Sequence, residues 1–108
     1  GDQVLVAVAD TLRSVLRSTD LCGRFGGEEF VCLLPETTET EARIVAERLR
    51  RSLAEQSVAT AEGIVRFTAS IGLTVADVSD ATVESLLQRA DVAMYDAKKA
   101  GRNRVVSC

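Results

Sequence analysis

Apolar residues recur at helical spacing in three stretches of the chain, which predicts three amphipathic helices. The first helix is expected over residues 3–17, the second directly after Thr38, and the third over residues 82–99. Thr38 and Glu41 have the spacing of a capping box, which marks where the second helix begins. Gly101 follows the third helix, where a left-handed residue commonly ends a helix. The predicted buried faces comprise Val4, Leu5, Val8, Leu12, Val15, Leu16, Ala42, Val45, Ala46, Leu49, Leu53, Leu86, Leu87, Ala90, Ala93, Met94 and Ala97.

Between these helices, other stretches have the pattern of β-strands. Residues 20–25 and 28–34 flank a Gly-Gly pair and predict a β-hairpin. Residues 64–76 alternate well enough to predict one long strand, and Val105 and Val106 predict a short last strand. The expected order is therefore α-β-β-α-β-α-β.

This order predicts a single domain of the α/β class, an α+β sandwich with a mostly antiparallel, ferredoxin-like sheet covered by helices. A complete sandwich of this kind has one more strand ahead of its first helix, normally in the middle of the sheet. The chain begins with the helix, so the expected fold lacks its first strand.

Composition narrows the possible chemistry. The 108 residues include no histidine, which excludes Ser-His-Asp and Cys-His catalysis and His-ligated zinc. The net charge of −3 argues against a general nucleic-acid-binding surface. No apolar run is long enough to cross a bilayer and no signal peptide opens the sequence, so we expect a cytoplasmic domain without direct membrane insertion.

The three cysteines have neither disulfide-framework nor zinc-site spacing. If Gly26 and Gly27 form a two-residue turn, Cys22 lies opposite Val31, and its sulfur points away from that of Cys32. We therefore expect buried, reduced thiols.

The Gly-Gly hairpin carries the candidate chemistry. Gly26 and Gly27 have no Cβ, so a nucleotide could approach their backbone closely. Glu28 and Glu29 follow at once, and carboxylates suit Mg²⁺, which prefers oxygen ligands. From these residues alone, a hairpin with merely solvated glutamates is an equally good interpretation.

Residues 26–30, Gly-Gly-Glu-Glu-Phe, resemble the signature of the GGDEF family of diguanylate cyclases in its Glu-containing form. Four further blocks are similar to the family's motifs in the same order. They are Gly1-Asp2, the R-x-x-D motif at 17–20, Thr68-Ala69-Ser70-Ile71-Gly72, and residues 90–98 with Gly101-Arg102-Asn103. The resemblance implies a nucleotidyl-cyclase-like fold and an enzyme that condenses two GTP molecules into cyclic di-GMP, releasing two pyrophosphates, for bacterial second-messenger signalling.

The resemblance also implies roles for individual residues. Glu28 and Glu29 would be catalytic and would hold Mg²⁺ or Mn²⁺. Gly26 and Gly27 would leave space for GTP, Asp2 would bind guanine, and Lys98 and Arg102 would bind phosphates. Without the resemblance, compensation of the helix dipole would be the better interpretation of these two cations.

Product inhibition by cyclic di-GMP is implied at Arg17 and Asp20, with Arg48 as an auxiliary cation. Catalysis would need a homodimer, because each domain would hold one GTP. The domain could be the output unit of a larger, membrane-associated sensor.

The resemblance covers about the C-terminal two-thirds of the family's domain. The family's first strand, with a second metal-binding aspartate, is not in the chain, so we expect residues 1–108 to be part of a GGDEF domain. Two alternatives to the enzyme therefore stay open: a catalytically incompetent fragment, or a receptor module for cyclic di-GMP. A purely structural dimerisation domain is a third, less favoured alternative.

Overall fold

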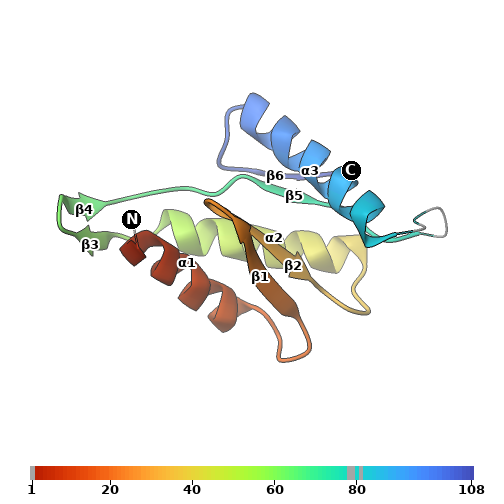
Figure 1. The fold of residues 1–108 in the computed structure, drawn as a ribbon, viewed down its shortest axis with the longest axis horizontal. Helices are drawn as coiled ribbons and strands as arrows, with labels where there is room; N and C mark the ends of the chain where they lie inside the picture. Colours follow the sequence, from red (N-terminus) through yellow and green to blue (C-terminus); the bar gives the residue numbers. More distant parts are fainter. Residues whose placement is uncertain (1, 78–79, 81) are drawn as a thin grey trace.

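A computed structural model describes residues 2–77, 80 and 82–108 of the chain (Figure 1). The three predicted helices are confirmed, with ends that differ by about two residues from those expected. The elements are α1 (Asp2–Val15), β1 (Leu21–Gly26), β2 (Glu29–Leu33), α2 (Glu39–Ala54), β3 (Val58–Thr60), β4 (Gly63–Val65), β5 (Ile71–Leu73), α3 (Val83–Lys99) and β6 (Val105–Ser107).

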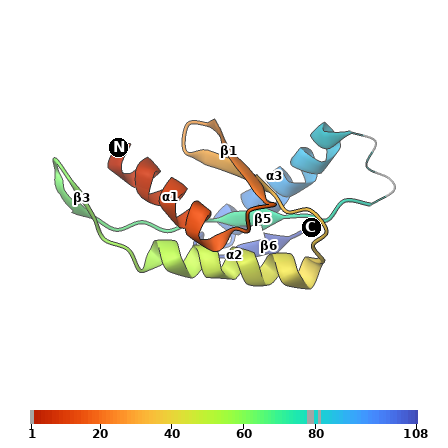
Figure 2. The same cartoon turned by 90° about the horizontal axis from the view of Figure 1, so that it is seen from below.

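The helices enclose the β5–β6 pair in a layered arrangement. Figure 2 shows α2 on one side of this pair and α3 on the other, and both helices contact both strands. Helix α1 packs on α2 and contacts β3. The most buried apolar side chains come from all three helices: Leu12, Ala46, Leu49, Leu53, Ala93 and Ala97.

The strands form three separate pairs within the described residues. β1–β2 and β3–β4 are antiparallel, and β5–β6 is parallel. The α+β class is thus confirmed, but the pairs do not join into one sheet in the part of the chain described. The predicted long strand over 64–76 is wrong, because only 63–65 and 71–73 have a strand partner and the residues between them have none.

The hairpin has a different register from the one that we predicted. Its two turn residues are Gly27 and Glu28, so Gly26 pairs with Glu29. An irregularity between Arg24 and Gly26 then shifts the register of the rest of the ladder. As a result Cys22 lies opposite Cys32, not opposite Val31.

The expectation of buried thiols is also wrong for two of the three cysteines. Cys22 and Cys108 are exposed and Cys32 is half-buried, and all three are free. Burial first, and then the neighbouring Cys22 and Asp20, raise the pKa of the Cys32 thiol to about 11.

The structure confirms the predicted start of α2 after Thr38 and the predicted end of α3 before Gly101. At α2, Thr38 Oγ1 accepts a hydrogen bond from the Glu41 N–H, and Glu41 Oε1 accepts one from the Thr38 N–H. After α3, Gly101 has φ +123°, and the Arg102 N–H donates to the Ala97 carbonyl at 2.9 Å. This pattern is a Schellman motif, which fixes the direction in which the chain leaves the helix toward β6.

Strand β5 lies unusually close to α3 at Gly72. A Cβ placed on Gly72 would lie 2.2 Å from the Met94 backbone nitrogen and 2.3 Å from the Ala90 carbonyl oxygen. Neither atom can move without shifting the helix. Ala93, which is 1% exposed, lies at the same contact. Only glycine therefore allows β5 and α3 to pack at this separation.

We accordingly expect Gly72→Ala to destabilise the protein. The added methyl group must push β5 away from α3, and overpacking of this kind costs about 1–3 kcal/mol. Urea unfolding followed by circular dichroism measures this as a lower transition midpoint. Gly23→Ala is the matched control, because a Cβ on Gly23 meets nothing within 4 Å. Equal midpoints for the two variants would contradict the role given to Gly72.

Candidate functional site

The turn of the hairpin is an open backbone surface followed by two carboxylates. Gly26 and Gly27 have φ values of +154° and +53°, which favour glycine, and a Cβ on either would meet nothing within 4 Å. Glu28 lies in the turn and Glu29 opens β2, and both are exposed. The predicted site residues of the hairpin are thus adjacent and accessible to a ligand.

The carboxylates fit a divalent metal by their chemistry but form only part of a site. Mg²⁺ is usually held by one or two carboxylates together with substrate phosphates and water. Glu28 and Glu29 supply that number of carboxylates. Within the described residues no group of three or more His, Cys, Asp or Glu side chains could hold a metal. A metal here would therefore need further ligands from outside the described residues.

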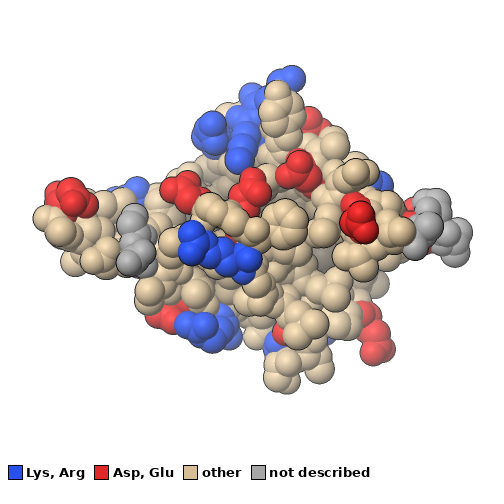
Figure 3. Space-filling view, viewed as in Figure 1, with Lys and Arg blue, Asp and Glu red and all other residues tan. Residues whose placement is uncertain are grey.

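The predicted phosphate-binding cations lie at the C-terminal end of α3. Lys98 is in the last turn of the helix, and Arg102 follows the cap with φ +64°. Figure 3 shows Lys and Arg side chains gathered over this end of α3. In the part of the chain described, no hydrogen bond or ion pair joins these two cations to Glu28 or Glu29.

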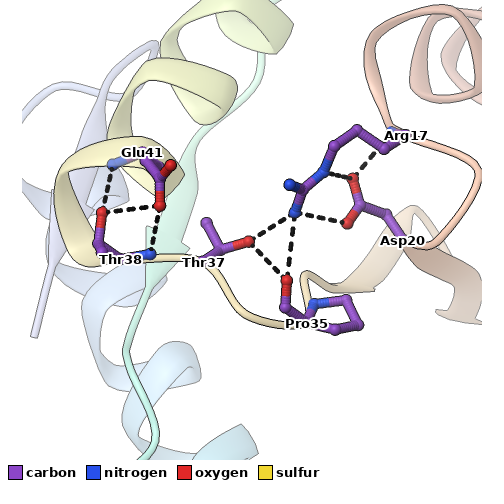
Figure 4. Close-up of polar contacts among 6 residues, drawn as sticks. All are labelled: Arg17, Asp20, Pro35, Thr37, Thr38 and Glu41. Carbon is purple, nitrogen blue, oxygen red and sulfur yellow. Dashed lines mark hydrogen bonds and ion pairs between the residues drawn. The ribbon is translucent and has the colours of Figure 1, made fainter.

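Arg17 and Asp20 of the R-x-x-D motif form an ion pair (Figure 4). Helix α1 ends before Arg17, and residues 17–20 form a turn closed by the Asp20 N–H donating to the Arg17 carbonyl at 3.0 Å. In return, the Arg17 N–H donates to Asp20 Oδ2 at 2.8 Å, and the guanidinium pairs with the same carboxylate. The Asp20 side chain is 1% exposed, whereas that of Arg17 is 55% exposed.

The hydrogen bond from the Arg17 backbone N–H lowers the pKa of Asp20 below its ordinary value, and the guanidinium lowers it further. The carboxylate is therefore ionised at neutral pH and keeps the guanidinium in place. Because most of Arg17 stays exposed, the arginine can meet a ligand while Asp20 holds it from behind.

Two further partners of Arg17 were not predicted from the sequence. Its guanidinium also donates to Thr37 Oγ1 at 2.7 Å and to the Pro35 carbonyl at 3.2 Å. These residues lie in the connection between β2 and α2, so no short-range spacing indicates them. Arg17 thus joins both ends of the hairpin.

The other predicted site residues are less informative. Arg48 is exposed on α2 and, among the described residues, makes no hydrogen bond or ion pair with Arg17 or Asp20. Asp2 is the first residue of α1, but its side chain lies outside what the structure describes, as does Gly1.

A basic cleft between α2 and the end of the chain was also not predicted from the sequence. Its volume is about 460 Å³, and the Arg50 side chain spans part of it by donating to Asn103 Oδ1 at 2.8 Å. Its arginines are largely occupied, since Arg50 also pairs with Glu47 and Arg43 with Glu39. The cleft is lined by Arg43, Glu47, Arg50, Asn103, Arg104 and Val105.

Comparison with known proteins places these features in a family. The family described as "Diguanylate cyclase, GGDEF domain" matches residues 1–104. Diguanylate cyclase DgcM of Escherichia coli K12 is 46% identical over 107 residues, which are 99% of this chain and 25% of DgcM.

Two solved structures are similar along nearly the whole chain. Diguanylate cyclase SiaD of Pseudomonas aeruginosa, in complex with its activator SiaC, has a TM-score of 0.92 and 42% identity over 99% of this chain and 41% of that one. The coiled coil and GGDEF domain of DgcB from Caulobacter crescentus, in complex with c-di-GMP, has a TM-score of 0.91 and 25% identity. This match covers 99% of this chain and 57% of that one.

The chain therefore belongs to the GGDEF diguanylate cyclase domain family. It spans about a quarter of the length of the curated relative DgcM.

The Arg17–Asp20 pair predicts how stability depends on pH. Because the folded-state pKa of Asp20 is lowered from about 3.8, its stabilising effect is present above that value and is lost as the pH falls through the folded pKa. We expect Asp20→Asn to lower the melting temperature at pH 7, and the difference from the unmodified protein to shrink below about pH 4.

The control for this prediction is Asp10→Asn, which removes an exposed carboxylate from the same i,i+3 arrangement with Arg13. Its effect should be small, because exposed pairs of this kind contribute little. Melting curves at a series of pH values measure both variants. A difference for Asp20→Asn that stays constant from pH 7 to pH 2 would contradict the assignment.

Proposed function

We propose that this domain is a diguanylate cyclase that joins two GTP molecules into cyclic di-GMP. The observation that carries the proposal is the intact Gly-Gly-Glu-Glu-Phe hairpin, whose open turn presents two exposed carboxylates. In the reaction, the 3′-hydroxyl of each GTP attacks the α-phosphate of the other. Two phosphodiester bonds form, the bonds to the β-phosphates break, and two pyrophosphates leave.

In this proposal, Glu28 accepts the proton of the attacking hydroxyl, and Glu28 and Glu29 hold Mg²⁺ or Mn²⁺. The metal, when bound, would offset the charge that develops on the phosphate oxygens. The hairpin chemistry supports this assignment, because hard divalent cations prefer oxygen ligands and the two carboxylates are adjacent. Gly26 and Gly27 leave the backbone accessible to the nucleotide.

Lys98 and Arg102 bind the β- and γ-phosphates, and Asp2 accepts hydrogen bonds from guanine. Lys98 lies in the last turn of α3 and Arg102 lies two residues after its C-cap, so two positive charges are available to a polyanionic ligand. Since each domain carries one half of the reacting pair, turnover requires two copies that face each other.

We further propose that the domain acts in the cytoplasm, as the output unit of a longer sensor protein. Within the described residues, no helix is both long and apolar enough to span a bilayer.

Arg17 and Asp20 form the site at which the product inhibits the enzyme, with Arg48 as an auxiliary cation. The exposed guanidinium supports this role, because arginine binds phosphate through paired N–H donors. The same site also serves the second candidate function, a receptor that binds cyclic di-GMP without making it.

The enzyme proposal predicts that Glu28→Gln strongly slows the synthesis of cyclic di-GMP. The protein at its full natural length, incubated with GTP and Mg²⁺, should form cyclic di-GMP, measured by chromatography. Loss of the base should lower kcat by about 100-fold or more, while the folded state is kept. Glu62→Gln is the control, since Glu62 is an exposed glutamate in the turn between β3 and β4. No product from the unmodified protein, or equal kcat for Glu28→Gln, would refute the enzyme.

The inhibitory site predicts that Arg17→Ala weakens binding of cyclic di-GMP in calorimetry. Losing charge-assisted hydrogen bonds to a phosphate should raise Kd by about 10-fold or more. Arg13→Ala is the control, because Arg13 is also exposed and also pairs with an aspartate three residues away. Binding without synthesis would favour the receptor, and equal Kd values for both variants would exclude this site.

A further inference from the structure

The bulged register of the hairpin places two cysteines directly opposite each other. Cys22 of β1 and Cys32 of β2 are partners in the antiparallel ladder. Opposite residues of such a ladder have Cα atoms about 4.5–5.5 Å apart, and their side chains lie on the same face. A disulfide needs a Cα separation of about 4.4–6.8 Å. The Cα separation that is typical of this pairing therefore falls within the range that a disulfide allows.

We propose that Cys22 and Cys32 are a site of reversible oxidation, at which hydrogen peroxide converts the two thiols into a disulfide across the hairpin. The two thiols are within hydrogen-bonding reach of each other. Cys22 is exposed and is the sulfur that an oxidant meets first, whereas Cys32 is half-buried. The two cysteines can be oxidised whether or not the domain has the proposed enzymatic function.

The reaction balances in two steps. Peroxide transfers one oxygen to the Cys22 sulfur, which becomes a sulfenic acid while one water is released. The Cys32 sulfur then attacks the Cys22 sulfur, so that the S–S bond forms and the S–O bond breaks. The hydroxide leaves with the Cys32 proton as a second water. Two thiols are oxidised by one peroxide, and a thiol reductant reverses the change.

The disulfide would cross-link the two strands that carry the candidate site. Cys22 lies between Asp20 and the turn at Gly27, so the bridge would connect the strand after the R-x-x-D motif to the strand that begins at Glu29. It would also fix the register, since a slip by one residue would turn the two sulfurs to opposite faces. Oxidation would therefore restrict motion of the hairpin.

Peptide mapping tests the proposal directly. The folded protein is treated with dilute hydrogen peroxide, its remaining thiols are alkylated, and it is digested with trypsin. Trypsin cuts after Arg24, between the two cysteines, so the bridge joins the peptides 18–24 and 25–43. We expect this linked pair at the summed peptide mass less two hydrogens, and its loss after reduction. Two alkylated peptides with no link, or a link to Cys108 instead, would overturn the proposal.

Engineered variants separate the predicted register from simple proximity. Cys108→Ser should keep the link, and Cys32→Ser should leave a Cys22 sulfenic acid that dimedone traps. The sharpest control combines Val31→Cys with Cys32→Ser, which moves the thiol by one residue to the opposite face of the strand. This double variant should form no bridge under the same treatment. A bridge in equal yield would show that proximity alone suffices, and would contradict the inference.

Discussion

The arrangement of the domain depends on the close contact between the backbones of β5 and α3 at Gly72. Because the Gly72 position has no room for a Cβ, the strand lies directly against the helix at Ala90 and Met94. The Schellman motif at Gly101 then turns the chain back, and β6 pairs in parallel with β5. The Ile71 N–H donates to the Arg104 carbonyl at 3.0 Å where this pairing begins. One tight contact thus sets the position of the helix end that carries Lys98 and Arg102.

The hairpin is held in a different way. Its strands contact mainly each other, and Figure 2 shows its turn projecting away from α2. Arg17 ties its base to the rest of the chain, by binding Asp20 before β1 and both Pro35 and Thr37 after β2. The residue proposed to bind an inhibitor therefore also anchors the hairpin that carries the carboxylates. A phosphate that bound Arg17 would compete with Thr37 and Pro35 for the guanidinium, and would therefore act on the contacts at the base of the hairpin.

The sequence predicted the elements that depend on local patterns. It did not predict the features that depend on partners far away along the chain. Both caps and all three helices follow from short-range spacing. The strand over 64–76 failed because alternation indicates an extended chain but not whether a partner strand lies beside it. The predicted hairpin register failed because the turn lies one residue later, at Gly27 and Glu28, and because an irregularity near Phe25 shifts the pairing. The contact of Arg17 with Thr37 spans 20 positions, beyond any motif.

Charge explains why the two halves of the candidate site would act only together. Glu28 and Glu29 are adjacent carboxylates on a chain of net charge −3, and neither makes an ion pair with Lys98 or Arg102 within the described residues. The hairpin carboxylates would repel a triphosphate alone, and a metal alone would find too few ligands among the residues that the structure describes. Glu28 and Glu29 would hold a metal that arrives with the triphosphate, and such a metal would offset the phosphate charge near the carboxylates. If the hairpin holds a metal and a nucleotide as proposed, the two would bind with positive coupling, each raising the affinity for the other.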